Sequence, residues 1–452
     1  MKNILILNSG TRCKLVSYFA RECKGKCQVI VTDNFDLAPS LYIADMFYVT
    51  KKYNEEGYID EIINICNENN IGLLISLIDP ELTLLSENKS KFDEIGVLLN
   101  TSTPEIIEKC FDKYQTYEFL KENGTIGFVA PSFGCSIEPY KTAFQNALKK
   151  WEAMGYKTDL GPNCYASSGI GISNDPKLCG EELNEWYCSK NNDILISCGG
   201  GELMCEVVPY MDFERMKNAT PKWYMGFSDN TNFVFLSTIL MDTAAIYGPC
   251  AATFGMEPWH ESVHVAWDLL CGKTNCVNGY DLWEREGLKD EENPLLPYNV
   301  TEPVVIKSYT CENGIAVETK EAIEFEGRLI GGCMDILQMY PGTKYDKVKE
   351  FNETYKEEGF IWFLEACELN TMSIRRCLWQ LKEAGWLEYV KGFLVGRPMM
   401  YGEEAFGIDQ FRAVTDVLAE YNVPIIMDID LGHLPPSMPI ISGSKAKVNV
   451  KG

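Results

Sequence analysis

Short apolar runs alternate with amphipathic segments along most of this chain, and the alternation restricts the fold more than any other feature. "NILILN" (3–8), "CQVIVTDN" (27–34) and "IGLLISLID" (71–79) have the composition of strands, and segments with helical spacing such as "YIDEIINICNENN" (58–70) lie between them. Strands that alternate with helices are typical of a parallel sheet covered on its faces. The pattern therefore predicts an α/β protein.

The alternation is interrupted in a way that suggests domain boundaries. With 452 residues, the chain is long enough for two or three domains. We predict a first domain over residues 1–124, a second over 125–255 and a third over 314–452. Residues 256–313 have weaker periodicity and an acidic stretch that contains proline, so we interpret them as a connecting or inserted segment.

Charge and composition exclude several classes of partner. The formal charge of −24 argues against binding to nucleic acid or to an anionic membrane surface. No apolar run has the roughly 18 residues needed to cross a bilayer, and the amino terminus lacks a signal-peptide cleavage site. We expect a cytoplasmic protein whose 18 cysteines are reduced thiols.

Three consecutive glycines mark one bend as a candidate site. The run Ile194–Ser197 is followed by Gly199, Gly200 and Gly201, and then by Met204 and Cys205 at the start of an amphipathic segment. A strained strand-to-helix turn of this kind can expose a nucleophile, as in a nucleophile elbow. The alternative is a tight turn in which glycine lets two backbones pack closely.

Seven spaced motifs resemble those of the LD-carboxypeptidase family, and the closer branch is that of the microcin C immunity peptidases. In chain order they are "TIGFVAPSFG", "ISCGGGELMCEVVPYMDF", "KWYMGFSDNTNF", "YGPCAATFG", "GRLIGGCMDIL", "FIWFLEACELN" and "DIDLGHLPP", and they cover about residues 125–452. The resemblance implies a cytoplasmic serine peptidase with two α/β domains, usually a homodimer, that needs neither a metal nor an organic cofactor. It also implies a Ser-Glu-His triad that cleaves an amide next to a carboxylate, or the bond of an aminoacyl nucleotide. We thus expect a small peptide or an aminoacyl-nucleotide-like substrate.

Two members of the triad can be carried over to this sequence. The glutamate falls on Glu365, after the apolar run Ile361–Leu364, and the histidine falls on His433, after "PIIMDIDLG". Carboxyl ends of strands are where α/β folds place their sites. An imidazole held by a carboxylate can take a proton from a nucleophile and return it later.

The nucleophile departs from the family pattern. The resemblance places the serine at Met204 or at Cys205, and neither residue is a serine. We predict that Cys205 attacks, because a thiol at a helix N-terminus beside an imidazole has a lowered pKa. Backbone amides of Gly200 and Gly201 would then form the oxyanion hole.

Two alternatives to Cys205 stay open. One is a catalytically inactive binding protein that has lost the serine. The other is a hydrolase that uses another group, and Ser228 is the available hydroxyl. We interpret the motif around Ser228 as a structural turn in which Ser228 or Asp229 caps a helix.

A competing motif is "HESVH", which contains two of the three histidines. On a helix, His260 and His264 would share one face, and with a third ligand they could hold zinc while Glu261 activates water. No third histidine follows at the usual spacing, so Glu284 or Glu286 would have to serve.

Residues 1–124 resemble the domain that precedes the ATP-binding part of ATP-grasp ligases. The matching features are "ILILNSGTR", "VIVTDNFDLAPSLYIADMFYVT" and the helical "DKYQTYEFLKENG". The chain then runs into "TIGFVAPSFG" instead of an ATP-binding domain. Ser9, Gly10 and Thr11 could cradle an anion, but we expect a Rossmann-like module that docks or orients substrate. The whole chain is then a Rossmann-like module followed by a two-domain α/β hydrolase.

Overall fold

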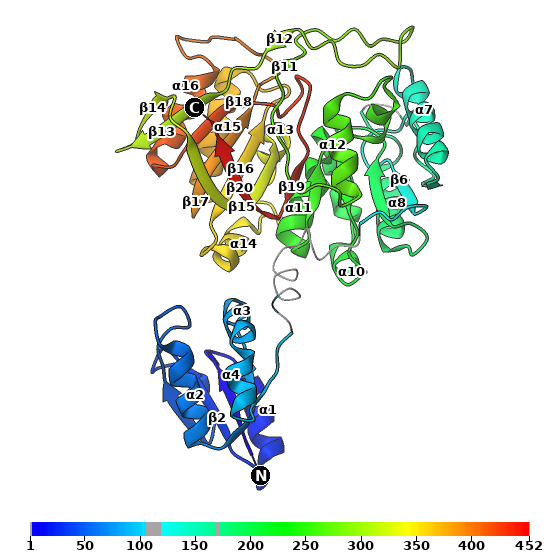
Figure 1. Cartoon of the computed structure of the whole chain (residues 1–452). Helices are drawn as coiled ribbons and strands as arrows, with labels where there is room; N and C mark the ends of the chain where they lie inside the picture. Colours follow the sequence, from blue (N-terminus) through cyan, green and yellow to red (C-terminus); the bar gives the residue numbers. More distant parts are fainter. Residues whose placement is uncertain (1, 103, 105–118, 169–170, 452) are drawn as a thin grey trace. The chain divides into compact units, whose positions relative to one another are not determined.

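The computed structural model describes residues 2–102, 104, 119–168 and 171–451, and it divides into two compact units (Figure 1). The first unit spans Met1–Thr116 and the second spans Tyr117–Gly452. The helix expected over residues 112–124 lies mostly outside the described residues. The first unit is built around a parallel sheet, and the second around one largely parallel sheet and one mixed sheet, so the predicted α/β class is confirmed.

The amino-terminal unit is a five-stranded parallel sheet of strand order β3-β2-β1-β4-β5. Buried isoleucine, valine and leucine side chains of its central strands pack against the helices and form the core. The elements are β1 (Asn3–Leu7), α1 (Cys13–Cys23), β2 (Val29–Asp33), η1 (Pro39–Tyr42), β3 (Met46–Val49), α2 (Tyr58–Glu68), β4 (Ile71–Ser76), α3 (Asp79–Glu87), α4 (Lys89–Glu94) and β5 (Leu98–Leu99).

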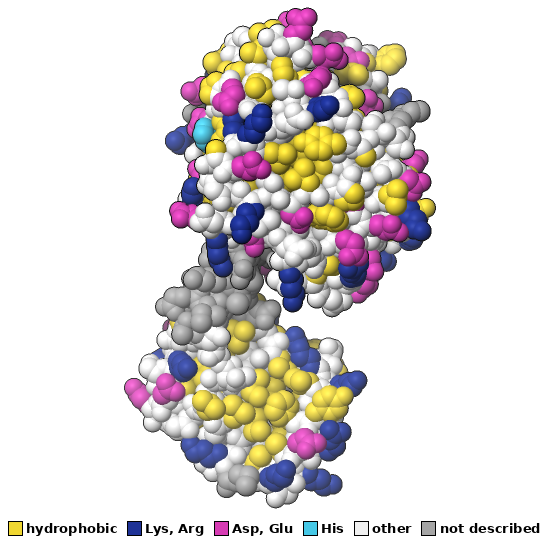
Figure 2. All heavy atoms as spheres, turned by 90° about the vertical axis from the view of Figure 1, so that its right-hand side faces the viewer, with side chains coloured by type: hydrophobic (Ala, Val, Ile, Leu, Met, Phe, Trp, Pro, Cys, Tyr) yellow, Lys and Arg dark blue, Asp and Glu magenta, His cyan; other side chains and the backbone are white. Residues whose placement is uncertain are grey.

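Hydrophobic side chains remain exposed around one edge of this sheet. Strand β3 pairs only with β2, and Met46, Phe47 and Val49 are 40–48% exposed. Leu37 and Tyr42 nearby are more exposed still. Figure 2 shows hydrophobic side chains gathered on one face of this unit, with lysine and arginine side chains around them. An exposed edge strand is a place where other chains can pair.

The second unit contains a six-stranded sheet of order β19-β10-β9-β8-β6-β7, in which only β19 (Ile440–Ser442) runs antiparallel to its neighbour. Helix α11 packs beside β9 and β10 and is buried over nearly its whole length. The elements are β6 (Thr125–Val129), α7 (Tyr140–Ala153), β7 (Lys157–Leu160), α8 (Pro176–Cys188), β8 (Ile194–Ser197), α9 (Met204–Val207), η2 (Val208–Tyr210), α10 (Phe213–Lys217), β9 (Tyr224–Gly226), η3 (Ser228–Asn230), α11 (Thr231–Met241), β10 (Ala245–Tyr247), η4 (Ala251–Gly255) and α12 (Glu261–Leu270).

A seven-stranded sheet of order β14-β13-β18-β17-β16-β15-β20 forms the other half of the second unit. Strand β16 is buried at every position, as expected for an apolar run in the parallel centre of a sheet. The elements are β13 (Lys307–Glu312), β14 (Ile315–Thr319), β15 (Ile323–Cys333), α13 (Met334–Leu337), α14 (Val348–Tyr355), β16 (Phe360–Glu365), α15 (Thr371–Glu383), β17 (Val390–Gly396), α16 (Gln410–Leu418), η5 (Ala419–Tyr421), β18 (Ile425–Ile429) and β20 (Lys445–Val450).

One hydrophobic core joins the two sheets of the second unit. After β18 in the seven-stranded sheet, the chain crosses to the six-stranded sheet as β19 (Ile440–Ser442) and returns as β20. Between α12 and β13, the described chain forms only the two-residue strands β11 (Leu282–Trp283) and β12 (Glu302–Pro303), apart from loops. Weak periodicity in this segment therefore reflects mostly irregular structure. No helix in the described part of the chain has the length and hydropathy needed to cross a membrane.

Candidate active site

Ser228 lies at a sharp turn between strand β9 and helix α11. Its backbone has φ +61°, a conformation that residues other than glycine rarely adopt. Strand, strained residue and helix in this order form the geometry of a nucleophile elbow. The Ser228 Oγ lies 2.8 Å from Nε2 of His433.

Glu365 is the last residue of β16, and its side chain is completely buried. Its Oε2 lies 2.8 Å from Nδ1 of His433, and its Oε1 accepts a 2.6 Å hydrogen bond from the hydroxyl of Tyr247. Ser228, His433 and Glu365 thus form a continuous Ser-His-Glu chain of hydrogen bonds. This arrangement can make a serine hydroxyl nucleophilic, because the imidazole accepts its proton while the carboxylate orients the ring.

His433 follows β18 in a loop that depends on Gly432. The φ of Gly432 is +112°, and a Cβ at this position would lie 3.1 Å from both Cβ and Oε2 of Glu365. Only glycine therefore lets the loop come this close to the carboxylate. The ring of His433 also packs 4.9 Å from the ring of Phe227, between centroids.

The mutual interaction of Glu365 and His433 shifts the pKa of each group so that the charged form is favoured. Burial alone would lower the pKa of His433, but the negative charge and hydrogen bond of Glu365 raise that pKa above its ordinary value. Burial likewise acts to raise the pKa of Glu365, and His433 together with the Tyr247 hydroxyl holds it below its ordinary value. Both shifts favour the imidazolium form of His433 and the carboxylate form of Glu365.

A buried ion pair anchors the histidine loop. Arg397 donates from Nη2 to Oδ1 of Asp430 over 2.6 Å and from Nη1 to the carbonyl of Asp428 over 2.8 Å. Asp430 and Arg397 are both almost fully buried. The second oxygen of Asp430 accepts a 2.8 Å hydrogen bond from the amide of Tyr280 in the connecting segment. The connecting segment therefore helps to fix the position from which His433 emerges.

The three glycines form a bend that wraps over the turn of Ser228. A Cβ on Gly200 would lie 3.2 Å from the Cβ of Ser228, so a larger residue would press on the serine. Asp229, next to Ser228, accepts hydrogen bonds from the amide of Met204 (2.9 Å) and from the hydroxyl of Ser132 (2.5 Å). Burial raises the pKa of Asp229 to about 6. Met204 is thus a buried core residue whose amide ties the two turns together.

Cys205 does not take the position expected for it. The Nε2 of His433 is hydrogen-bonded to Ser228, which lies at the turn after β9. Cys205 lies instead on the short helix α9, beyond the glycine bend. Burial and then the charge of Asp229 raise the pKa of the Cys205 thiol, so the expected lowering is wrong in direction. A thiol with a raised pKa is mostly protonated at neutral pH and is a poor nucleophile.

The interpretation of Ser228 as a helix cap is also wrong. No side chain caps η3 or α11, and the Ser228 hydroxyl is directed to His433 instead. The glycines at 199–201 directed the prediction to Cys205, and Ser228, which follows the next strand along the chain, was kept only as an alternative. The signal that could have found it is "GFSD" between a short apolar strand and the long apolar helix "TNFVFLSTILM".

The HExxH motif does not form the predicted pair of ligands on one helix. Helix α12 begins at Glu261, and His260 precedes it as the N-cap, where Nδ1 accepts a 3.1 Å hydrogen bond from the amide of Ser262. His264 lies within the helix and packs against Trp259. Among the described residues, no group of three histidine, cysteine, aspartate or glutamate side chains is placed to hold a metal ion.

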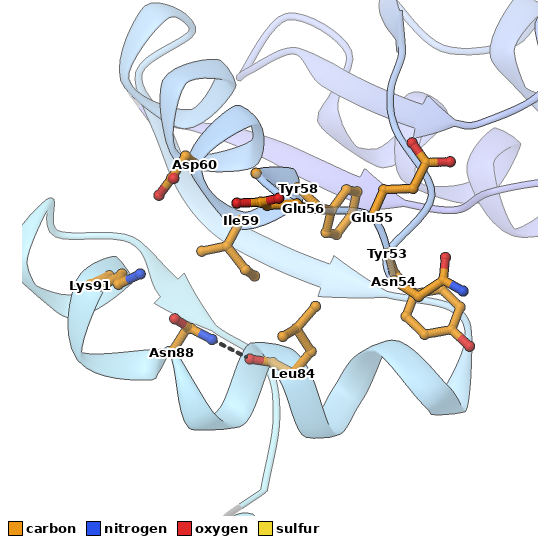
Figure 3. Close-up of a pocket in the computed structure, with 11 residues that line it drawn as sticks. Tyr53, Asn54, Glu55, Glu56, Tyr58, Ile59, Asp60, Leu84, Asn88 and Lys91 are labelled. Carbon is orange, nitrogen blue, oxygen red and sulfur yellow. Dashed lines mark hydrogen bonds between the residues drawn. The ribbon is translucent and has the colours of Figure 1, made fainter.

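A separate cavity of about 520 Å³ lies in the amino-terminal unit, between the start of α2 and the helices α3 and α4 (Figure 3). Glu55, Glu56, Asp60 and Lys91 contribute charged groups to its lining. No triad residue lines it.

At the other candidate site of this unit, the amide of Gly10 already donates to the carboxylate of Asp33 over 2.7 Å, which removes one donor from the predicted anion cradle.

Comparison with protein-family models identifies three segments. Residues 126–248 match the LD-carboxypeptidase N-terminal domain and residues 326–448 match the LD-carboxypeptidase C-terminal domain. Residues 4–99 match the PylC-like N-terminal domain. Ser228 falls in the first of these matches, and both Glu365 and His433 fall in the second.

Individual relatives are similar over about seven tenths of the chain. A Vibrio cholerae protein that bears a carboxypeptidase name is 27% identical over 320 residues, which cover 69% of this chain and 88% of that protein. The microcin C7 self-immunity protein MccF of Escherichia coli is 23% identical over 340 residues, which cover 73% of this chain and 92% of that protein.

Solved structures show the same fold. MccF in complex with aspartyl sulfamoyl adenosine has a TM-score of 0.60 at 20% identity and covers 74% of this chain and 95% of its own. An MccF-like protein from Streptococcus pneumoniae in complex with AMP has a TM-score of 0.58 at 22% identity and covers 72% of this chain and 96% of its own. The two-domain arrangement of the second unit is therefore shared with these proteins.

Proposed function

Because this chain belongs to the LD-carboxypeptidase family, we propose that it is a serine hydrolase that cleaves an amide or amide-like bond next to a carboxylate or a nucleotide. The observation that carries the proposal is the hydrogen-bonded chain from Ser228 through His433 to Glu365. Each of the three side chains is held by a different strand end or loop of the second unit. Such a constellation is recognised by its geometry and roles, whatever the order of its residues in the chain.

Each residue of the constellation has a defined role in this reaction. Ser228 Oγ attacks the scissile carbonyl as His433 Nε2 takes its proton, and the carbonyl oxygen becomes an oxyanion. The amide of Asp229, the residue after the nucleophile, and the amide of Gly200 stabilise that oxyanion. His433 then protonates the leaving amine, and a water molecule attacks the acyl-serine by the same steps. Glu365 keeps the imidazole in place and balances its charge.

The substrate class rests on the family and on the ligands of related structures. The family is named for carboxypeptidase activity, and the related structures hold aspartyl sulfamoyl adenosine and AMP. We therefore infer a small peptide with a free carboxylate, or an aminoacyl nucleotide analogue, as the substrate. The inactive binding protein is disfavoured, because that alternative depended on a missing serine and Ser228 supplies the hydroxyl.

The test compares two substrates and two variants. Hydrolysis of a murein L,D-tetrapeptide and of an aminoacyl sulfamoyl adenosine is measured for the wild type, Ser228→Ala and Cys205→Ala. We expect the wild type to hydrolyse one of them, Ser228→Ala to lose about 10⁴-fold or more in kcat, and Cys205→Ala to stay within a few-fold of the wild type. Loss of activity in Cys205→Ala with retention in Ser228→Ala would reverse the assignment. Binding of either compound without turnover by the wild type would favour the binding protein.

Four further expectations belong to the same proposal. From the sequence and its resemblance to the family, we expect domain limits at residues 124, 255 and 313, a cytoplasmic location and a homodimer. The amino-terminal unit is proposed to dock or orient the substrate without chemistry of its own, since its family match is followed directly by the LD-carboxypeptidase match. Light scattering of the purified chain would test the dimer.

A further inference from the structure

Tyr247, the last residue of strand β10, lies between the nucleophile and the triad carboxylate. It is completely buried. Its hydroxyl donates a 2.6 Å hydrogen bond to Oε1 of Glu365 and accepts a 3.1 Å hydrogen bond from the amide of Ser228. One side chain is therefore bonded both to the backbone of the nucleophile and to the carboxylate that orients the histidine.

These two bonds turn the linear triad into a closed ring. Starting at the Ser228 amide, the ring passes through the Tyr247 hydroxyl, both oxygens of Glu365 and both nitrogens of His433, and it returns to the Ser228 Oγ. We propose that Tyr247 is a positioning residue that closes this ring, fixing the turn of Ser228 and tuning the negative charge that Glu365 presents to His433. This inference rests on the hydrolase function proposed above.

The Ser228 half of the ring concerns backbone conformation. A serine with φ +61° is strained, and such residues persist only where their surroundings hold them. The Tyr247 hydroxyl gives the partly buried amide of Ser228 an acceptor in that conformation. Without this acceptor, the turn could relax and carry Oγ away from His433.

The Glu365 half concerns charge. A hydrogen bond donated to Oε1 withdraws negative charge from the carboxylate, so less remains on Oε2 to hold a proton on His433. Removing the donor should therefore make His433 more basic. Other titratable groups also face this pair. Glu202 and Cys367 lie around His433. Cys333 lies beside Glu365 and donates its thiol to Asp335.

Two phenylalanine rings pack against the ring of Tyr247. The ring lies 5.0 Å from that of Phe227 and 5.9 Å from that of Phe363, between centroids. Phe227 precedes the nucleophile, and Phe363 precedes Glu365 by two residues on β16. The same two segments that carry the triad residues therefore also hold the tyrosine ring.

The test uses a readout that needs no turnover. The chain has three histidines, so the titration of His433 can be followed by NMR after ¹⁵N-histidine labelling, with His260 and His264 as internal references. In Tyr247→Phe we expect the proton affinity of His433 to rise about tenfold, which is about one pKa unit. Replacing Tyr247 with 3-fluorotyrosine keeps both bonds and makes the hydroxyl a stronger donor, so it should shift the His433 titration in the opposite direction.

A matched control is available in the amino-terminal unit. Tyr58 is also buried and also donates its hydroxyl to a buried glutamate, Glu81. Tyr58→Phe should leave the titration of His433 unchanged. If Tyr247→Phe and the fluorinated variant likewise leave it unchanged, the proposal is overturned, and Tyr247 only packs.

Kinetics then connect the ring to the reaction. With a substrate in hand, Tyr247→Phe should lower kcat about tenfold or more with little change in KM, and the acid limb of its pH profile should move upward. A uniform loss at every pH, without a shift of the limb, would contradict the tuning of Glu365. If the wild type hydrolyses neither substrate, the hydrolase proposal fails, while the NMR titration still decides whether the ring exists.

Discussion

His433 Nε2 lies 2.8 Å from Ser228 Oγ, although the two residues are 205 positions apart in the chain. Ser228 follows a strand of the six-stranded sheet, and His433 follows a strand of the seven-stranded sheet. The contact therefore depends on the carboxyl ends of strands in both sheets meeting at one place. Glu365, at the end of β16, completes the arrangement from the second sheet.

The raised pKa of His433 predicts where activity begins on the pH scale. His433 must be neutral to accept a proton, and Glu365 raises its pKa above the ordinary 6.5. We expect kcat/KM to rise with pH through a limb above pH 6.5. The same shift makes the imidazolium–carboxylate pair stabilise the fold fully below pH 6.5, and this contribution is lost as pH rises through the raised pKa. A pH series of rates and of unfolding free energies measures both. A limb at or below pH 6.5 would contradict the prediction.

Replacing Glu365 should impair catalysis through the histidine. In Glu365→Gln, the amide no longer balances the imidazolium and can hold the wrong tautomer of His433, so we expect kcat to fall by up to about 10⁴-fold. The pKa of His433 should fall toward its ordinary value or below. Glu182→Gln is the matched control, since Glu182 is a buried glutamate that accepts from the amides of Ala130 and Asn163. That variant should change stability without moving the pH limb.

Gly432 should not tolerate a side chain. In Gly432→Ala, the new Cβ meets Glu365 at 3.1 Å and the backbone keeps φ +112°, so we expect a large loss of kcat together with a lower melting temperature. Gly402→Ala separates the steric contact with Glu365 from the backbone strain of a positive φ, because Gly402 has φ +82° and nothing within 4 Å of the added Cβ. The control should cost about 1 kcal/mol of unfolding free energy and leave the rate intact. Equal effects of the two variants on the rate would argue against the close approach.

The buried pair of Arg397 and Asp430 should contribute far more than a surface pair. In Asp430→Asn, the Arg397 guanidinium loses its counter-charge in the interior, and we expect a loss of about 3–5 kcal/mol in unfolding free energy. Arg412→Met removes the exposed pair with Asp416 and should cost at most about 1 kcal/mol. Chemical denaturation of both variants makes the comparison. Similar losses would mean that solvent reaches the Arg397 site.

Thiol reactivity distinguishes Cys205 from a catalytic cysteine. Because burial and Asp229 raise the pKa of its thiol, Cys205 should react with iodoacetamide more slowly than the exposed Cys276. Peptide mass spectrometry over a time course ranks the two sites. Faster labelling at Cys205, with a rate that drops in His433→Ala, would restore the cysteine as a nucleophile.

The sequence predicted the fold because its signals are local. Apolar runs such as Phe360–Leu364 are long enough to identify buried parallel strands, and the strand ends then pointed to Glu365 and His433. The contact expected between these two residues is present in the structure. Their catalytic roles remain part of the proposal.

The proposed nucleophile, Ser228, was harder to predict because its signal is conformational. Glycine at 199–201 makes an unusual turn visible in the sequence, but a serine with positive φ looks like any other serine. Tyr247 gave no signal either, since its role depends on a hydroxyl that reaches both Ser228 and Glu365 across the interface of two sheets. Long-range pairings of this kind are not encoded in spacing along the chain.

The path of the last strands links the proposed activity to the assembly of the two sheets of the second unit. The chain leaves β18, presents His433, joins the six-stranded sheet as β19 beside β10, and returns to the seven-stranded sheet as β20. His433, the general base of the proposed mechanism, is thus held in a segment fastened at one end to each half of the second unit. The rate of hydrolysis would then report whether the two halves are docked. The rate would fall to zero when the halves separate, even if each sheet kept its own secondary structure.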